Sequence, residues 1–232
     1  MTAVIHPDDV EPFIDHGVEV RRMFDDRNGC AALHQVIARL PLGRVELPPP
    51  EYGEAVLYVA SGRGTLELNG EQHALEPDSG VFARAGEWPT FDIPGPDDLV
   101  IVGVVARNDK GGPSERSRVV VRFADQPEEE ASPERSFRYL VETGSVTQFL
   151  GIVQPSKAPF HSHPYDEVGY IVEGTGVAHV DGEQIPLRTG SCFHLAPGQV
   201  HCIENVGPGP MRILGVFHPS GSPASRSYQS NN

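Results

Sequence analysis

The feature that most constrains the fold is an internal repeat with an offset of 112 residues. Seven identical residues recur at this offset, and most of them are turn-type glycines. The first copy holds Gly62, Gly64, Gly70, Glu71, Gln72, Leu75 and Gly86, and the second holds Gly174, Gly176, Gly182, Glu183, Gln184, Leu187 and Gly198. Identities at one fixed offset predict two copies of one structural unit that close their hairpins at the same places.

The runs between these turns predict β-strands. The 232 residues include 25 glycines and 22 prolines, which separate short runs rich in valine, isoleucine and phenylalanine. Such a pattern is typical of an all-β chain. In the first copy we expect strands at residues 32–40, 55–60, 64–68, 80–83 and 99–106, with a tight hairpin turn at Asn69-Gly70.

Composition divides the chain into four segments. We expect a first β-rich domain over residues 1–107, a polar and acidic linker over 108–135, a second β-rich domain over 136–218, and a flexible tail over 219–232. The linker combines glycine, glutamate and proline, as solvated connectors do. Residues 8–30 give the weakest pattern, and we expect an irregular arm with one strand there.

Charge and cysteine content exclude several function classes. The formal net charge is −14, and no basic stretch could follow a phosphate backbone, so we expect no nucleic acid and no membrane as partners. No apolar run approaches membrane-spanning length, and we see no signal peptide at the N-terminus. Three cysteines are too few for a disulfide framework, so a cytoplasmic location is the default prediction.

The second copy contains two histidines, His161 and His163, that lie two residues apart. On an extended strand both imidazoles would leave the same face. Glu167 enters the next apolar run, and His201 follows a Pro-Gly turn and opens another strand. Three imidazoles and one carboxylate directed at one point would make a divalent-metal site.

These residues resemble the two motifs of the cupin superfamily. His161, His163, Glu167 and Gly174 fit G-x5-H-x-H-x3,4-E-x6-G, and Gly190, Gly198, His201 and Asn205 fit G-x5-P-x-G-x2-H-x3-N. Pro155 and Ala196 depart from the motifs at turn positions that hold no ligand. Together with the repeat, the resemblance covers about residues 30–218 and implies two tandem double-stranded β-helix barrels, the jelly-roll architecture of a bicupin.

The two copies differ at the positions that the resemblance assigns to the metal. The first copy carries Pro49, Glu51, Ala55 and Pro89 where the second carries His161, His163, Glu167 and His201. A single carboxylate does not hold a transition metal against hydration. We therefore expect one divalent metal per chain, bound only by the second copy.

The donor set and the resemblance indicate a metalloenzyme. Nitrogen and oxygen donors suit Fe(II), which we favour, and also Mn, Ni, Cu or Zn. Four protein ligands on an octahedral metal leave about two positions for substrate, water or dioxygen. We favour a dioxygenase-type oxidoreductase acting on a small polar organic molecule. A metal-dependent isomerase, a ureidoglycine-type amide hydrolase and a non-catalytic small-ligand-binding cupin remain open.

Residues near the motifs are candidates for the lining of this site. The apolar and polar candidates are Gln148, Phe149, Phe160, Tyr170, Phe193 and Ile203. Tyr139, His179 and His194 could add polar contacts, although such residues more often belong to the core or the surface. No motif places an arginine or lysine, so the sequence assigns neither the substrate nor the catalytic residues. Cupins often dimerise through sheet edges, so the resemblance allows a homodimer.

Overall fold

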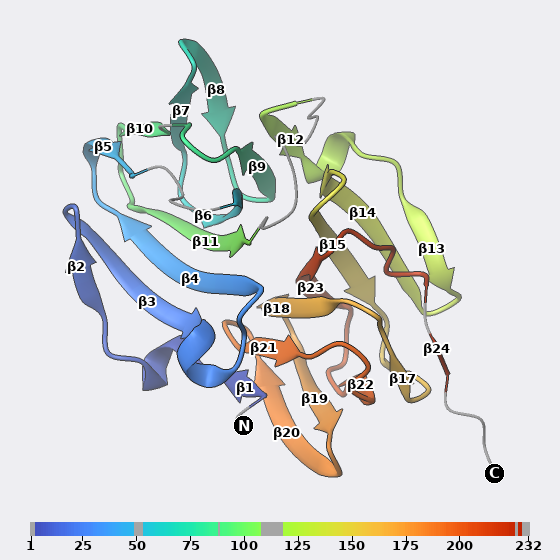
Figure 1. Cartoon of the computed structure of the whole chain (residues 1–232). Helices are drawn as coiled ribbons and strands as arrows, with labels where there is room; N and C mark the ends of the chain where they lie inside the picture. The colour runs from blue at the N-terminus through green and yellow to red at the C-terminus, as the bar shows by residue number, and fades with distance from the viewer. Residues whose placement is uncertain (1–2, 49–52, 88, 108–117, 226, 229–232) are drawn as a thin grey trace.

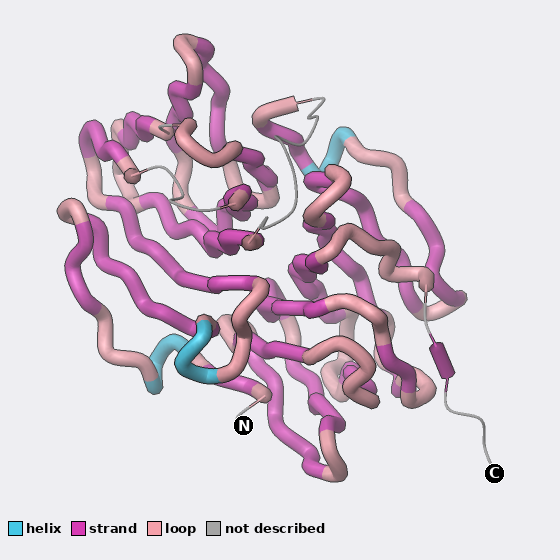
Figure 2. The backbone as a smooth tube through the Cα atoms, viewed as in Figure 1, coloured by secondary structure: helices cyan, strands magenta, loops and turns pink. Residues whose placement is uncertain are grey.

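The computed structural model of the chain describes residues 3–48, 53–87, 89–107, 118–225 and 227–228. Strands and loops make up nearly all of these ranges (Figure 2). The helices within them are three short 3-10 turns, η1 (Pro7–Asp9), η2 (Asp26–Asn28) and η3 (Phe123–Asp125). The all-β prediction is confirmed. Within the described ranges no helix is long and apolar enough to span a membrane.

The first barrel consists of two sheets that enclose an apolar core (Figure 1). The larger sheet has the order β12 (Val120–Arg122), β9 (Ser79–Ala83), β6 (Glu54–Ser61), β11 (Leu99–Ala106), β4 (Leu33–Leu40), β3 (Val18–Phe24) and β2 (Phe13–Asp15). The smaller sheet has the order β5 (Gly43–Glu46), β10 (Thr90–Ile93), β7 (Gly64–Leu68) and β8 (Glu71–Leu75). Residues 8–30 therefore contain two strands, where we expected one.

The second barrel repeats this plan. Its larger sheet has the order β1 (Val4–Ile5), β21 (Cys192–Leu195), β18 (Asp166–Glu173), β23 (Met211–His218), β15 (Thr147–Val153), β14 (Arg135–Glu142) and β13 (Glu129–Ser132). Its smaller sheet has the order β20 (Glu183–Arg188), β19 (Thr175–Val180), β22 (His201–Asn205), β17 (His161–Ser162) and β24 (Ser227–Tyr228), and β16 (Ser156–Lys157) also pairs with β22. The two larger sheets correspond strand for strand, and the smaller sheet of the second barrel adds strands to the plan of the first. This correspondence confirms the tandem jelly-roll barrels.

The repeated hairpins close as the glycine pattern predicts. Asn69 and Gly70 have φ angles of 54° and 80°, and Asp181 and Gly182 have 53° and 82°. Two successive residues with positive φ match the twist of the flanking strands, which is why the pairs Asn-Gly and Asp-Gly occur at both turns.

The barrels exchange their first strands. β1 begins the chain but pairs with β21 of the second barrel, placing Val4 opposite Phe193. β12 precedes the strands of the second barrel but pairs with β9 of the first, placing Val120 opposite Val81. Each exchanged strand covers an edge that would otherwise present unpaired backbone groups.

The segment expected to be a linker therefore contributes to both barrels. Residues 108–117 lie outside the described part of the chain. The remainder contains β12 in the first barrel and β13 in the second, with η3 between them. The division into residues 1–107, 108–135 and 136–218 stays a proposal about folding units.

A shared apolar cluster holds the two barrels together. The first barrel contributes Met23, Phe24, Cys30, Leu33, Val56, Phe82, Val104 and Ala106, and the second contributes Val141, Val146, Val168, Cys192 and Val216. Burying each larger side chain is worth about 1.5–3 kcal/mol. Across the same interface, the Arg212 guanidinium lies 2.8 Å from an Asp78 carboxylate oxygen.

Candidate metal centre

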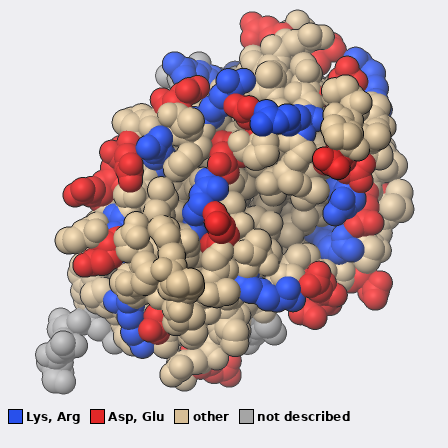
Figure 3. All heavy atoms as spheres, turned by 180° about the vertical axis from the view of Figure 1, so that it is seen from behind, with Lys and Arg blue, Asp and Glu red and all other residues tan. Residues whose placement is uncertain are grey.

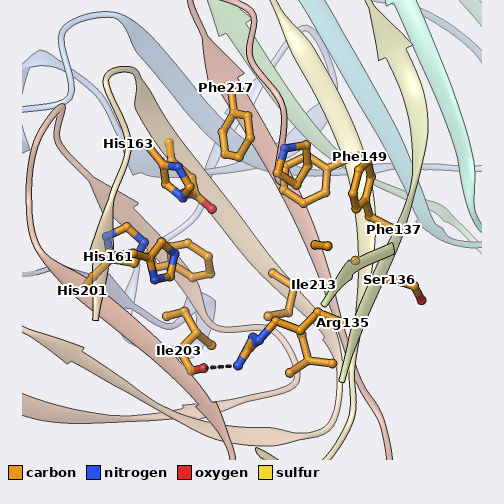
Figure 4. Close-up of a pocket in the computed structure, with 16 residues that line it drawn as sticks. Arg135, Ser136, Phe137, Phe149, His161, His163, His201, Ile203, Ile213 and Phe217 are labelled. Atoms are coloured by element: carbon orange, nitrogen blue, oxygen red, sulfur yellow. Dashed lines mark hydrogen bonds and ion pairs between the residues drawn. The ribbon is translucent and has the colours of Figure 1, made fainter. Parts of the chain in front are cut away.

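Three imidazoles of the second barrel converge on one point (Figure 4). His161 lies on β17 and is the direct partner of His201, which opens β22. His163 directly follows β17 and lies two residues after His161, so its ring returns to the same side. One ligand atom from each of the three side chains lies within 4.8 Å of the others, and all three residues are buried. This spacing can hold a divalent metal ion.

Hydrogen bonds fix the tautomer of each imidazole. His161 Nδ1 lies 2.9 Å from the Pro159 carbonyl oxygen, and His201 Nδ1 lies 2.9 Å from that of Gln199. His163 Nδ1 lies 3.0 Å from the Ser225 carbonyl oxygen. Because a carbonyl oxygen only accepts, each Nδ1 donates its proton and each Nε2 keeps its lone pair. Histidine ligands of metals have this arrangement.

Glu167 lies beside the three histidines. It is buried on β18, and its Oε2 atom lies 3.8 Å from His163 Nε2. It lines the same cavity but is not part of the group whose ligand atoms all lie within 4.8 Å. The position suits a fourth ligand that binds the metal through a carboxylate oxygen, and that role remains a proposal.

The C-terminal tail contacts the histidine cluster. Ser225, which holds the ring of His163, belongs to the segment expected to be flexible. The Tyr165 hydroxyl donates to the Ser222 carbonyl oxygen at 2.8 Å, and the Tyr165 ring stacks on His163 with centroids 5.1 Å apart. Residues 219–225 and β24 are thus docked on the second barrel, whereas residues 226 and 229–232 lie outside the described chain.

The cavity in front of the imidazoles is small and mostly apolar. It has a volume of about 80 Å³, and aromatic rings form its wall opposite the histidines (Figure 4). Phe149 packs against Phe217 with centroids 4.8 Å apart and against Phe137 at 6.1 Å. Gly215 lies beneath the ring of Phe149, where a Cβ atom would overlap it. The space suits a ligand of only a few atoms.

Arg135 is a cavity residue that the sequence analysis did not identify. It begins β14, lines the cavity, and donates from Nη2 to the Ile203 carbonyl oxygen at 3.0 Å. A guanidinium is always charged and carries five N–H donors, so Arg135 places a positive charge in the cavity wall. No spacing rule relates Arg135 to the histidine motifs, and only the pairing of β14 with β15 brings it here.

The structure places the predicted lining residues in three groups. Phe149, Phe193 and Ile203 line the cavity. Gln148 precedes Phe149 on β15, and Tyr170 follows Gly169 on β18. Because side chains alternate along a strand, both point away from the cavity and towards the other barrel. Phe160 is 41% exposed at the surface.

The polar candidates make their contacts elsewhere. His179 Nε2 lies 2.7 Å from a Glu204 carboxylate oxygen. His194 Nε2 lies 2.9 Å from an Asp166 carboxylate oxygen, and the Tyr139 hydroxyl donates to Ser222 Oγ at 3.2 Å. None of the three lines the cavity in front of the metal-binding histidines.

The cysteines are buried thiols. Burial raises the pKa of Cys30 to about 12 and raises the pKa values of Cys192 and Cys202 as well. Protonated, enclosed thiols neither bind metals nor act as nucleophiles. These three side chains therefore serve packing.

The first barrel has no comparable cluster within the described ranges. Among the described residues of both barrels, His161, His163 and His201 of the second form the only group of three or more His, Cys, Asp or Glu side chains that could share a metal. Ala55 and Pro89 occupy two of the four corresponding positions, as the repeat predicts. Pro49 and Glu51, at the other two, lie outside the described residues.

Comparison with known proteins agrees with this architecture. Residues 149–217 match the Cupin domain family Cupin_2. The fold covers 98% of this chain and 79% of the structure of a mutant Bacillus subtilis oxalate decarboxylase, with a TM-score of 0.77 and 13% identity. At that identity the likeness shows the fold. Residues 149–217 thus carry a cupin domain, and the chain has a two-barrel fold with a histidine cluster suited to a metal in its second barrel.

Curated relatives match about a third of the chain. The tetracenomycin polyketide synthase protein TcmJ of Streptomyces glaucescens is 34% identical over 80 residues, which cover 33% of this chain and 54% of that protein. An oxalate-binding protein of Thermotoga maritima is 34% identical over 63 residues, covering 27% and 52%. The polyketide synthase CurC of Streptomyces cyaneus is 36% identical over 84 residues, covering 34% and 53%. The match spans about half the length of each of these relatives.

Proposed function

We propose that this chain is a metal-dependent enzyme that acts on a small organic acid in its second barrel. The observation that carries the proposal is the set of three buried imidazoles whose Nδ1 protons are held by backbone carbonyls. Their Nε2 atoms are left to bind one divalent metal per chain, with Glu167 as the fourth ligand. Fe(II) remains our first choice of metal, and Mn(II) our second.

The cavity supports a carboxylate substrate. A bound divalent metal would supply Lewis-acid polarisation and two open positions. The positive charge of Arg135 in the cavity wall would attract a carboxylate. The rings of Phe137, Phe149 and Phe217 exclude water from the rest of the substrate. A cavity of about 80 Å³ limits that substrate to a few heavy atoms.

Two reactions compete. An oxygenase is our first candidate, because two open metal positions allow substrate and dioxygen to bind together. A decarboxylase is the second, because the whole chain superposes on an oxalate decarboxylase and one relative is an oxalate-binding protein. Elemental analysis of protein purified without oxygen should find about one metal per chain. Short carboxylic acids, including oxalate, should then be screened with Fe(II) and Mn(II) while dioxygen uptake and carbon dioxide release are recorded.

The screen separates the alternatives. Dioxygen uptake only with Fe(II) supports the oxygenase, and carbon dioxide release without net dioxygen uptake supports the decarboxylase. Turnover with Zn(II) in the absence of oxygen would indicate the isomerase or hydrolase. Ligand-dependent stabilisation without turnover of any acid would contradict an enzymatic role and favour a binding protein.

Arg135 offers the test of the substrate class. Arg135→Gln keeps a polar side chain with N–H donors but removes the charge, so we expect KM for a carboxylate substrate to rise about tenfold or more. Arg188→Gln is the control, because Arg188 lies on β20 and pairs with Asp8 at the surface. Equal KM values in the two variants would contradict a carboxylate contact at Arg135.

Partners and location follow as proposals. We propose a small-molecule substrate and no nucleic acid, since the net charge is −14 and acidic and basic groups are interspersed on the described face in Figure 3. A cytoplasmic location and a homodimer remain predictions, for which cell fractionation and light scattering are the measurements.

A further inference from the structure

The first barrel contains a cavity larger than that of the metal centre. Its volume is about 290 Å³, against about 80 Å³ in the second barrel. Pockets that bind small molecules begin at about 300 Å³. Strands β3, β4, β6 and β11 supply most of the wall, and nearly all of their contributions are aliphatic.

Three valines account for the difference in volume. Val36 faces Gly103 across β4 and β11, as Phe149 faces Gly215 across β15 and β23. Gly103 and Gly215 are equivalent in the repeat, so Val36 replaces Phe149. The same registers make Val20 the counterpart of Phe137 and Val105 that of Phe217. The first barrel thus lacks the rings that fill the second.

The valines remain accessible although they face inwards. Val20, Val36 and Val105 are only partly buried, whereas Phe137, Phe149 and Phe217 are at most 7% exposed. Apolar side chains that face a barrel interior and still touch solvent lose the stabilisation that full burial would give. A ligand with an apolar body would recover it.

The metal-binding positions of this barrel are apolar where they are described. Ala55 stands at the position of Glu167, and Pro89 at that of His201, and both line the cavity. Neither side chain can hold a metal or a polar ligand. The interior therefore selects an apolar group.

A cation lies among the lining residues. Arg22 is exposed, and its guanidinium carbon is 4.0 Å from the centroid of the Phe13 ring, which orients it. It forms no ion pair with any carboxylate in the described ranges. Asp15 also lines the cavity, but its side chain is 52% exposed and its Oδ1 atom lies 2.8 Å from His16 Nδ1. Solvent screens the repulsion between that carboxylate and an anion.

We propose that the first barrel binds a small amphipathic carboxylic acid. Its apolar chain occupies the space lined by Val20, Val36 and Val105, and its carboxylate pairs with Arg22. The site is distinct from the metal centre and does not depend on the reaction proposed there. It would make the first barrel a ligand-binding module on the same chain as a metal-dependent barrel.

Binding of octanoate to the full chain tests this proposal by calorimetry. We expect one octanoate per chain, with unchanged affinity after a chelator removes the metal. Octanol should bind more weakly and octylamine more weakly still, because neither offers an anion to Arg22. Octanoate that fails to bind, or that binds only while metal is present, would overturn the proposal.

Two kinds of variant locate the site. Val36→Phe with Val105→Phe reproduces the filling of the second barrel and should abolish octanoate binding, while an unchanged metal content reports an intact fold. If that variant does not fold, Ala55→Leu fills the same space with one smaller change. Arg22→Gln should weaken octanoate about tenfold and leave octanol unchanged. Asp15→Asn should not weaken octanoate.

The remaining outcomes count against the proposal. Unchanged octanoate affinity in both filling variants would show that octanoate binds elsewhere. Unchanged affinity in Arg22→Gln would show that the carboxylate does not contribute to binding at this site. A concentration-dependent dimer that the filling variants dissociate would assign the cavity to a second copy of the chain.

Discussion

At the scale of single residues, His163 links the metal centre to the rest of the molecule. It offers Nε2 to the cluster, donates from Nδ1 to the tail, and stacks on Tyr165. His163→Ala should weaken metal binding at least about 100-fold, because one of three imidazole donors is lost. The protein should still fold, because His163 is not part of the apolar core of this barrel.

Metal content after dialysis and the far-ultraviolet circular dichroism spectrum are the measurements. His16→Ala is the control, because His16 is an exposed imidazole in a turn of the first barrel. Full metal content in His163→Ala would contradict the assignment of the site.

The sequence predicted the histidine cluster and Phe149 but not the other wall residues Arg135, Phe137 and Phe217. His161, His163 and His201 stand at short, fixed distances from turns, so local spacing was sufficient to bring them together. Arg135 depends on the register of β14 against β15, which contains an irregularity between Tyr139 and Val141. A one-residue change of register would reverse the face on which a side chain lies, and no local pattern specifies that register.

At the scale of elements, the docked tail is a support for the site. Its contacts use the backbone carbonyls of Ser222 and Ser225, which any residue type would provide. Composition therefore carries no signal for this docking, and a serine-rich segment was expected to be flexible. The exchange of β1 and β12 between the barrels was not predicted for a related reason, since strands of two or three residues carry no pattern that specifies a partner.

Truncation after residue 218 should weaken metal binding without unfolding the second barrel. The change removes the acceptor that holds the Nδ1 proton of His163, and loss of such a partner lowers metal affinity about 10- to 100-fold. Competition with a chromogenic chelator measures the effect. Removal of residues 229–232 alone is the matched control. Equal affinities in the two truncated proteins would show that the tail does not orient His163.

At the scale of the whole molecule, the repeat predicted two barrels but not how they are joined. The turn glycines recur at a fixed offset because each hairpin requires positive φ at the same place. The inter-barrel cluster consists of apolar residues on the outer faces of the two barrels. A repeat in the sequence does not predict which outer faces pack against each other. The cluster shows that the copies form one body.

The buried thiols of this interface lead to a prediction about alkaline pH. Cys30 and Cys192 both belong to the inter-barrel cluster, and burial raises both pKa values, that of Cys30 to about 12. In the unfolded chain a thiol ionises near its ordinary pKa of about 8.5. The folded state therefore retains these protons at a pH where the unfolded state loses them. Their contribution to stability is complete below the ordinary pKa and is lost as pH rises.

Urea unfolding between pH 8 and pH 10 measures this loss. Above about pH 9 the free energy of unfolding should fall with a slope approaching about 1.4 kcal/mol per pH unit for each thiol. Cys30→Ala with Cys192→Ala should lower stability at every pH, because the smaller side chains leave space in the cluster, but should flatten the slope. Buried Tyr58 and Tyr170 also have raised pKa values, so a shallower decline should remain towards pH 10. Burial also raises the pKa of Cys202, so that thiol should leave a smaller slope in the double variant. A double variant with the slope of the unaltered chain would show that Cys30 and Cys192 do not carry the effect.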